Sequence, residues 1–414
     1  MTQELERLGQ SRTSDAQDAA QAASPSLATR AVHGGPDPGD MGGLLNPPVH
    51  RASTIIFKTV DAYRRRHDGF YDDVIYGLYG TETTFALARA VADLEGGYQS
   101  VITSSGSAAV ALALAAFTSA GDHILVSDVV YGHTRRFCQE AMVQYGVEVT
   151  YFDPLIGGAI ADLVRPNTRA IFMESPGSHT FEVSDVPAIC AVARKHGIVT
   201  MIDNTWATPI YFRPIEHGVD VSIAAATKYM AGHSDVMLGA MTAGSEEIYQ
   251  KLKDSAGRWG VSASPDDCYL VHRGLRTLPS RLRHHERTAK ALIEWLQGQP
   301  EVLRILYPAL ESDPGHKIWK RDFDGASGLF GVVMKPMDDA AIDRFFNHFS
   351  VFLLGSSWGS YVSLAVPAAP PPVRLAGTPP LEGTLVRFHA GLEDPADLIA
   401  DLERAFARLR SGAA

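Results

Sequence analysis

"GIVTMIDNTWATPIYFRPIEHGVDVSIAAATKYMAGHSD", residues 197–235, holds two short apolar runs, each followed by polar side chains. Asp203 follows the first run, and Thr227 and Lys228 follow the second, with Lys228 lying 25 residues beyond Asp203. That spacing fits one strand–helix unit plus the next strand, so Asp203 and Lys228 should lie at the same end of a parallel sheet. Burying either charge is costly without a partner. Two interpretations remain, a structural salt bridge or a functional site.

The same alternation of strands and helices begins near residue 98. It predicts an α/β fold with a mostly parallel central sheet covered by helices. In such sheets ligands bind beyond the carboxyl ends of the strands. The expected strands are 98–104, 123–129, 147–153, 169–175, 197–203 and 220–226, with helices at 106–119, 132–145 and 185–196.

The flanking segments differ in composition from this central region. Residues 1–29 are rich in Ala, Gln, Ser and Asp, which predicts a poorly ordered tail, and the Gly- and Pro-rich residues that follow predict an extended arm. We therefore divide the chain into a tail and arm, a large domain and a smaller C-terminal α/β domain, at 1–80, 81–274 and 275–414. The C-terminal part should contain helices at 279–298 and 395–410, strands at 328–335 and 384–391, and a loop at 366–374.

Composition excludes several classes of function. The 414 residues carry a formal net charge of −10, which argues against nucleic-acid binding, and we interpret the basic run 64–67 as a solvated or ligand-facing surface. The longest apolar stretch, 108–117, is too short to cross a bilayer, so we expect no membrane association. The three cysteines show no metal-binding spacing, which indicates reduced thiols in a cytoplasmic protein.

Two further features occur just after predicted strands. A Ser/Gly turn opens the helix at 106–119 and offers free backbone N–H groups to a phosphate, although ordinary turn chemistry would look the same. Tyr131 follows another strand and could cover a flat ring or be a core tyrosine. Pyridoxal phosphate would use all four features: a lysine for its aldehyde, a carboxylate for its ring nitrogen, an aromatic cover and a phosphate site.

Motifs along most of the chain strengthen this interpretation. From about residue 30 to 410 the sequence resembles the transsulfuration (Cys/Met-metabolism) branch of the fold type I pyridoxal phosphate enzymes, and within it the bacterial cystathionine β-lyases. The motifs that carry the resemblance are "NPPVHRASTIIF", "YGLYGTETTFALARAVADLEGG", "FDPLIG", "ESPGS", "VPAI", "IDNTWA", "AATKYMAGHSD", "RGLRTLPSRLRHHE", "KRDFDGASGLF", "SSWGSYVSL" and "GTLVRFHAGLED".

The resemblance implies a role for each matching residue. Lys228 would be the lysine that binds the cofactor, Asp203 the partner of the ring nitrogen and Tyr131 the stacking residue. The remaining cofactor and substrate contacts would come from Gly106, Ser107 and Thr227 at the phosphate, Arg387 at the substrate α-carboxylate, and Ser357 and Trp358 beside it. Tyr76 would reach the active site of a neighbouring subunit and join Lys228 and Tyr131 in catalysis, within a homotetramer built as a dimer of dimers with shared sites.

Three positions depart from the family pattern. Leu78 stands where an arginine usually crosses to the neighbour's phosphate, and the basic residues 64–66 are the nearest substitutes in sequence. Ser356 and Val362 stand where a tyrosine and a glutamate are expected in similar β-lyases. These departures leave open what replaces the arginine and how the substrate side chain is selected.

The resemblance implies a carbon–sulfur β-lyase acting on a sulfur amino acid, L-cystathionine, and releasing homocysteine, pyruvate and ammonia. One alternative is a γ-lyase or γ-replacement enzyme of the same family, or a cysteine or cystine lyase. Another is a cofactor-binding regulatory protein without turnover, against which the intact set of Lys228, Asp203, Tyr131 and Arg387 argues. His284, His285 and Glu286 do not form a metal-binding motif. His233 is expected to be a loop residue rather than a general base.

Overall fold

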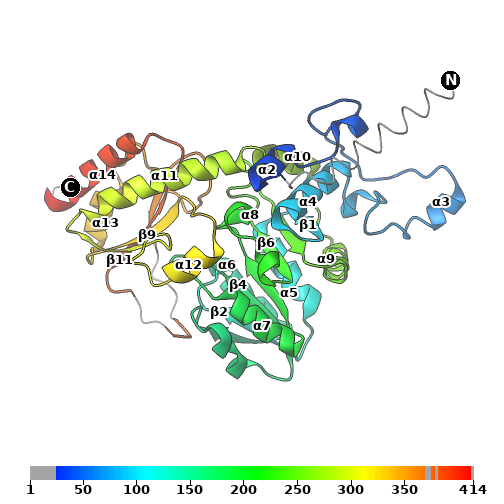
Figure 1. Ribbon diagram of the computed structural model, residues 1–414, viewed down its shortest axis with the longest axis horizontal. Coiled ribbons are helices and arrows are strands. Elements are labelled where there is room, and N and C mark those ends of the chain that lie inside the picture. The colour runs from blue at the N-terminus through cyan, green and yellow to red at the C-terminus, as the bar shows by residue number, and fades with distance from the viewer. Residues whose placement is uncertain (1–24, 369–373, 378–380, 412–414) are drawn as a thin grey trace, which may run out of the picture.

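The computed structural model describes residues 25–368, 374–377 and 381–411, so residues 1–24 of the tail predicted at 1–29 lie outside the described residues. The chain forms a large sheet with helices on both faces and a smaller C-terminal sheet (Figure 1). The predicted α/β fold is thereby confirmed.

The large sheet has the strand order β1-β7-β6-β5-β4-β2-β3. Six strands run in one direction, and only β7 is antiparallel to its neighbours β1 and β6. β5 and β6 are adjacent, so the two apolar runs within residues 197–235 end side by side. The strands are β1 (Gln99–Thr103), β2 (His123–Ser127), β3 (Glu148–Phe152), β4 (Thr168–Glu174), β5 (Val199–Asp203), β6 (Val221–Ala224) and β7 (Gly239–Ala243).

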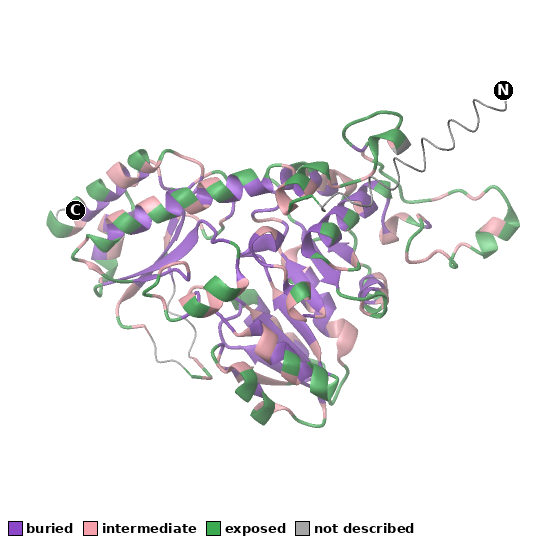
Figure 2. Ribbon diagram, viewed as in Figure 1, coloured by how far each residue is buried: buried purple, intermediate pink, exposed green. Residues whose placement is uncertain are grey.

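Apolar side chains on both faces of the strands hold this sheet between two helical layers. Along β4, Ile171 and Met173 enter one core while Phe172, between them, enters the other. Figure 2 shows the strands as buried and the outer helix surfaces as exposed. The helices of this part are α4 (Glu82–Glu95), α5 (Gly106–Phe117), α6 (Gly132–Phe137), which continues as a π-helical turn over Cys138–Met142, α7 (Val186–His196), α8 (Thr208–Tyr211), α9 (Glu246–Arg258) and α10 (Pro265–Leu275).

The C-terminal part is an antiparallel sheet of order β10-β11-β9-β8 packed against long helices. Its predicted helices and strands are all found, and Arg387 in β11 pairs with Gly331 in β9. The elements are α11 (Leu278–Gln297), β8 (Val302–Leu306), α12 (His316–Asp322), β9 (Leu329–Met334), α13 (Asp339–Phe346), β10 (Leu364–Pro367), β11 (Thr384–His389) and α14 (Pro395–Ser411).

The N-terminal region corrects one expectation. Residues 27–33, assigned to the tail and the extended arm, form helix α2 (Leu27–His33). The Ser26 hydroxyl caps this helix, and Arg30 forms an ion pair of 2.6 Å with Asp93 of α4, so capping and docking outweigh the polar composition. The arm itself projects from the body and carries the short helix α3 (Val60–Arg64) at its tip (Figure 1).

Among the described residues, no helix is both long and apolar enough to cross a membrane. Cys138, Cys190 and Cys268 are buried free thiols. Burial raises the pKa of the Cys138 thiol to about 12, so this thiol is inert at neutral pH.

Candidate active site

A cavity of about 210 Å³ opens at the carboxyl ends of the strands of the large sheet, against residues of the C-terminal part. Nearly all of the candidate site residues identified in the sequence line this cavity. Those that line it are Gly106, Ser107, Tyr131, Asp203, Thr227, Lys228, Ser356, Ser357, Trp358 and Arg387.

Lys228 lies just beyond β6, and its amine points into this cavity. The Nζ atom donates a hydrogen bond of 2.7 Å to Ser357 Oγ and lies 5.4 Å from the centre of the Trp358 ring. Burial, helped by the positive charge of Arg387, lowers the pKa of Lys228 to about 8, while Asp203 acts in the opposite direction. A fraction of this amine is therefore neutral, and nucleophilic, near neutral pH.

Asp203 ends β5, and Thr205 holds it in place. One carboxylate oxygen accepts the backbone N–H of Thr205 at 2.9 Å and its hydroxyl at 2.5 Å. Burial raises the pKa of Asp203 despite these hydrogen bonds. Since no salt bridge between Asp203 and Lys228 is found, the simple structural ion pair considered at the start does not explain the two residues.

Tyr131 is positioned by a carboxyl group that the sequence analysis missed. Glu174 ends β4, pairs in register with Asp203, and accepts the backbone N–H of Tyr131 at 2.6 Å. Burial, together with the nearby Asp203 charge, raises the pKa of Glu174 well above its usual value. The signal that could have found Glu174 is its place at the carboxyl end of a predicted strand.

The start of α5 forms one wall of the cavity. Ser105 caps this helix by accepting the N–H of Ala108 at 3.1 Å. A Cβ at Gly106 would lie 2.7 Å from the Cβ of Ala225, so only glycine lets the helix start approach the residues before Lys228. Thr227 lines the same wall, but its hydroxyl already bonds to the backbone of Leu238.

Arg387 reaches the cavity from β11. It is 9% exposed, and its Nη2 donates to the carbonyl oxygens of Ser356 at 2.5 Å and Ser357 at 3.4 Å. Within the described part of the chain, Arg387 has no carboxylate within salt-bridge distance, and its Nε and Nη1 make no hydrogen bond. A buried guanidinium without a counter-ion is costly, so this end of the cavity suits an anion.

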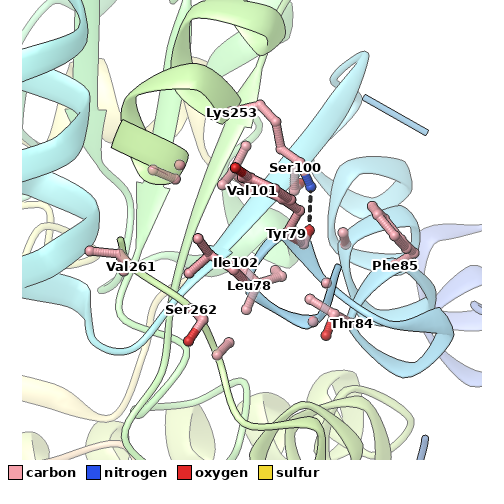
Figure 3. Close-up of a pocket in the computed structure, with 16 residues that line it drawn as sticks. Leu78, Tyr79, Thr84, Phe85, Ser100, Val101, Ile102, Lys253, Val261 and Ser262 are labelled. Carbon is pink, nitrogen blue, oxygen red and sulfur yellow. Dashed lines mark hydrogen bonds between the residues drawn. The ribbon is translucent and has the colours of Figure 1, made fainter. Parts of the chain in front are cut away.

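Tyr76 does not line this cavity. It is exposed on the arm, where its ring lies 6.3 Å from that of Tyr79. Leu78 lines a hollow of about 30 Å³ between the arm and the body (Figure 3). In the same hollow, Lys253 Nζ donates to the carbonyl of Tyr79 at 2.6 Å and lies 4.6 Å from the centre of the Phe85 ring.

The basic residues considered as substitutes for the missing arginine lie at α3. Arg65 pairs with Asp61 at 2.6 Å, and Arg66 lies over the ring of Tyr63. None of residues 64–66 lines the cavity of their own chain.

His233, His285 and Glu286 each have a hydrogen-bond or ion-pair partner within the protein. His233 bonds through Nδ1 to the carbonyl of Ala231 at 2.7 Å, as expected for a loop residue. His285 bonds to the carbonyl of Ala390 at 2.8 Å, and Glu286 pairs with Lys290 at 2.6 Å. Among the described residues, no group of three His, Cys, Asp or Glu side chains is placed to hold a metal ion.

The cavity fits pyridoxal phosphate in each of its parts. An amine, a carboxylate and a ring are directed at one space, and a capped helix start with a glycine closes one side of it. The aldehyde, the ring nitrogen, the ring face and the phosphate of the cofactor would each have a protein group of suitable chemistry in this cavity.

Comparisons with known proteins agree with this geometry. The family model "Cys/Met metabolism PLP-dependent enzyme" matches residues 28–407. The chain is 42% identical to the cystathionine beta-lyase of Escherichia coli and 41% identical to the L-alanine/L-glutamate racemase of Wolbachia pipientis, each match covering 89% of this chain and 94% of the relative. The solved cystathionine gamma synthase of Xanthomonas oryzae pv. oryzae superposes with a TM-score of 0.83 at 29% identity, covering 94% of this chain and 100% of that one. The chain thus belongs to the PLP-dependent enzymes of Cys/Met metabolism, and its cofactor is pyridoxal phosphate.

Proposed function

We propose that the protein is a carbon–sulfur β-lyase that converts L-cystathionine and water to homocysteine, pyruvate and ammonia. The observation that carries the choice of an amino-acid substrate is the buried guanidinium of Arg387, which has no carboxylate partner among the described residues and lies in the same cavity as Lys228. A carboxylate meets a guanidinium fork with two hydrogen bonds. The 42% identity to a named cystathionine beta-lyase supports the choice of reaction.

The proposed roles of the chain's residues follow from their positions. Lys228 would hold the cofactor through its amine, and the same amine, once free, would remove the proton from the substrate Cα. Arg387 holds the α-carboxylate so that this proton lies near Lys228. Asp203 would keep the ring nitrogen protonated, and Tyr131, whose backbone N–H is bound by Glu174, would cover the ring. When bound, pyridoxal phosphate supplies the electron sink that makes the Cα proton acidic enough to remove.

We further propose that Gly106 and Ser107 hold the phosphate through their backbone N–H groups, with Thr227 beside them. Ser357 and Trp358 line the substrate side of the pocket. Tyr76 enters the site of a neighbouring subunit, as its exposure would allow, and the assembly is a homotetramer with shared sites. The large and small domains then meet at the cavity, with boundaries at 81–274 and 275–414.

Two other reactions share this machinery. A γ-lyase or γ-replacement enzyme would use the same residues, and a solved cystathionine gamma synthase has the same fold. Amino-acid racemisation is the second, favoured by the 41% identity to a racemase of alanine and glutamate. It also begins with proton removal at Cα, so the residues near Lys228 do not distinguish it.

A substrate panel distinguishes β-elimination, γ-elimination and racemisation. The cofactor-loaded protein is incubated with L-cystathionine, L-alanine and L-glutamate, and pyruvate, 2-oxobutyrate and D-amino acids are measured in the same samples. We expect pyruvate from L-cystathionine as the dominant product. Dominant 2-oxobutyrate would assign γ-elimination, and D-alanine or D-glutamate formed faster than pyruvate would assign racemisation.

A further inference from the structure

Asp128, Glu182 and Arg374 meet where the C-terminal part of the chain contacts the part that carries the large sheet. Asp128 follows β2, Glu182 lies in the loop between β4 and α7, and Arg374 lies in the segment between β10 and β11. Their side chains are 0%, 16% and 9% exposed, respectively. None of the three lines the candidate active-site cavity, and none has a role in the function proposed above.

Arg374 reaches from the C-terminal part to both carboxylates. Its Nε donates to Asp128 Oδ2 at 3.0 Å, and its Nη1 donates to Glu182 Oε2 at 3.0 Å. Asp128 Oδ2 also accepts the backbone N–H groups of Leu375 at 2.9 Å and Ala376 at 3.0 Å. Removing one member of a buried ion pair is costly because the remaining charge loses its partner. The segment that begins at Arg374 is therefore fastened at a defined point.

At Asp128 these contacts reach the turn that carries Tyr131. Arg135 Nη2 donates to Asp128 Oδ1 at 2.5 Å and to the Asp128 carbonyl at 2.6 Å. The backbone N–H of Arg135 donates to the carbonyl of Tyr131 at 3.0 Å. Asp128 and Arg135 flank Tyr131 in sequence, so their ion pair closes the turn around it. Arg374 binds the other oxygen of the same carboxylate and holds this turn from the outside.

At Glu182 the contacts reach a loop that lines the cavity. The carbonyl of Glu182 accepts the N–H of Gly177 at 2.9 Å, and Ser178 donates its N–H to the carbonyl of Val129 at 2.7 Å. A Cβ at Gly177 would lie 2.4 Å from a methyl group of Val129, so the approach is as close as glycine allows. Gly177 and Ser178 both line the cavity. This loop is therefore packed against the turn described above, and Arg374 joins their outer ends.

The C-terminal part also forms the other wall of the cavity. Ser357, Trp358 and Arg387 belong to it, and β11, which carries Arg387, follows the segment that contains Arg374. The position of Tyr131 relative to these residues therefore depends on contacts between the two parts of the chain. The contacts of Arg374 are of this kind and reach the turn of Tyr131 directly through one carboxylate.

We propose that Arg374 is a positioning residue for Tyr131. By joining Asp128 to Glu182, it holds the turn of Tyr131 and the adjoining cavity loop in place at the cofactor. This assignment rests on the proposed function only in taking Tyr131 as the residue that covers the cofactor ring. It applies equally to β-elimination, γ-elimination and racemisation, because all three use the same ring.

The test observes the cofactor before any substrate is added. Visible circular dichroism of the cofactor-loaded protein depends on the asymmetric surroundings of the ring, so a displaced Tyr131 changes this signal. Arg374→Ala removes both ion pairs, and Arg374→Lys keeps a cation that can pair with one carboxylate at a time. Arg321→Ala is the matched control: Arg321 also joins the C-terminal part to the other part, at 2.9 Å from Asp185, but neither residue lines the cavity.

We expect the visible circular dichroism per bound cofactor to fall in Arg374→Ala. Its kcat/KM for L-cystathionine should be about 10-fold below that of the wild type, because small displacements of positioning groups are costly in rate. Arg374→Lys should recover part of both quantities, and Arg321→Ala should keep both at wild-type values. Far-UV circular dichroism identifies the variants that are folded at the assay temperature. If Arg374→Ala is not folded, Arg374→Lys must still show a reduced signal.

Two outcomes would overturn the assignment. One is a wild-type visible signal in folded Arg374→Ala, and the other is an equal change in Arg321→Ala, which would indicate general loosening between the two parts. Tyr131→Ala is measured in parallel. If Tyr131→Ala leaves the signal unchanged, the ring-covering role fails and takes this assignment with it. If only the Arg374 variants leave it unchanged, the role of Arg374 alone is refuted. A failure of the β-lyase assignment would instead appear in the products of the wild-type protein.

Discussion

Replacing Arg387 by alanine should remove most of the affinity for the substrate carboxylate and leave the cofactor in place. Nε and Nη1 of Arg387 make no hydrogen bond to the described part of the chain, so both can bind the ligand. Each charge-assisted hydrogen bond contributes about 1.5–3 kcal/mol, so two give about 3–6 kcal/mol. Water entering the space left by the side chain will solvate part of the exposed carboxylate. We therefore expect the binding free energy to weaken by an amount near the lower end, about 3 kcal/mol, which raises Kd about 100-fold.

The assay combines steady-state kinetics with calorimetry of an unreactive carboxylate ligand. KM and Kd should rise together in Arg387→Ala, and the absorbance of bound cofactor should be retained through dialysis. Arg387→Lys is the control that keeps the charge but not the planar fork. Its Kd for the carboxylate ligand should lie between those of the wild type and of Arg387→Ala. If Arg387→Ala loses cofactor while carboxylate affinity stays at the wild-type level, Arg387 belongs to the cofactor site and the assignment is refuted.

Four further changes test other parts of the site. Lys228→Ala should lose the yellow absorbance of covalently held cofactor and nearly all turnover, and wild-type turnover in this variant would reject the role of Lys228. Asp203→Asn should slow exchange of the substrate Cα proton by about 100-fold or more while the melting temperature stays near wild type; near-normal exchange would make this carboxylate structural. Covalent attachment of cofactor to the cofactor-free protein should quicken as pH rises through about 8, because the amine of Lys228 is protonated below that pKa; a midpoint near 10 would contradict the lowered value. Leu78→Arg should destabilise the protein by about 1–3 kcal/mol, measured by urea unfolding, because it forces a cation into a hollow of about 30 Å³ that already holds Lys253; tighter cofactor retention would instead reveal an under-neutralised phosphate.

The sequence predicted the large sheet because its strands and helices alternate with clear apolar runs. The positions of Asp203 and Lys228 followed from that alternation alone, since parallel strands present their carboxyl ends at one edge. Arg387, Ser357 and Trp358 lie far along the chain, and only the family resemblance placed them with Lys228. The structure brings them to the same cavity.

Other features depend on interactions that a periodic pattern does not encode. The antiparallel strand β7 has the sequence "GAMTA", and a Cβ at Gly239 would lie 2.2 Å from the carbonyl oxygen of Ser105. This close backbone approach, which requires glycine, is not visible in a pattern of apolar residues. Helix α2 was missed because the polar composition of this segment reveals neither the cap by Ser26 nor the docking of the helix on α4.

The most direct test of the central claim is the identity of the oxo acid formed from L-cystathionine by the purified, cofactor-loaded protein. The account predicts pyruvate, formed in equal amount with homocysteine and abolished in Lys228→Ala. Formation of 2-oxobutyrate with cysteine would contradict it.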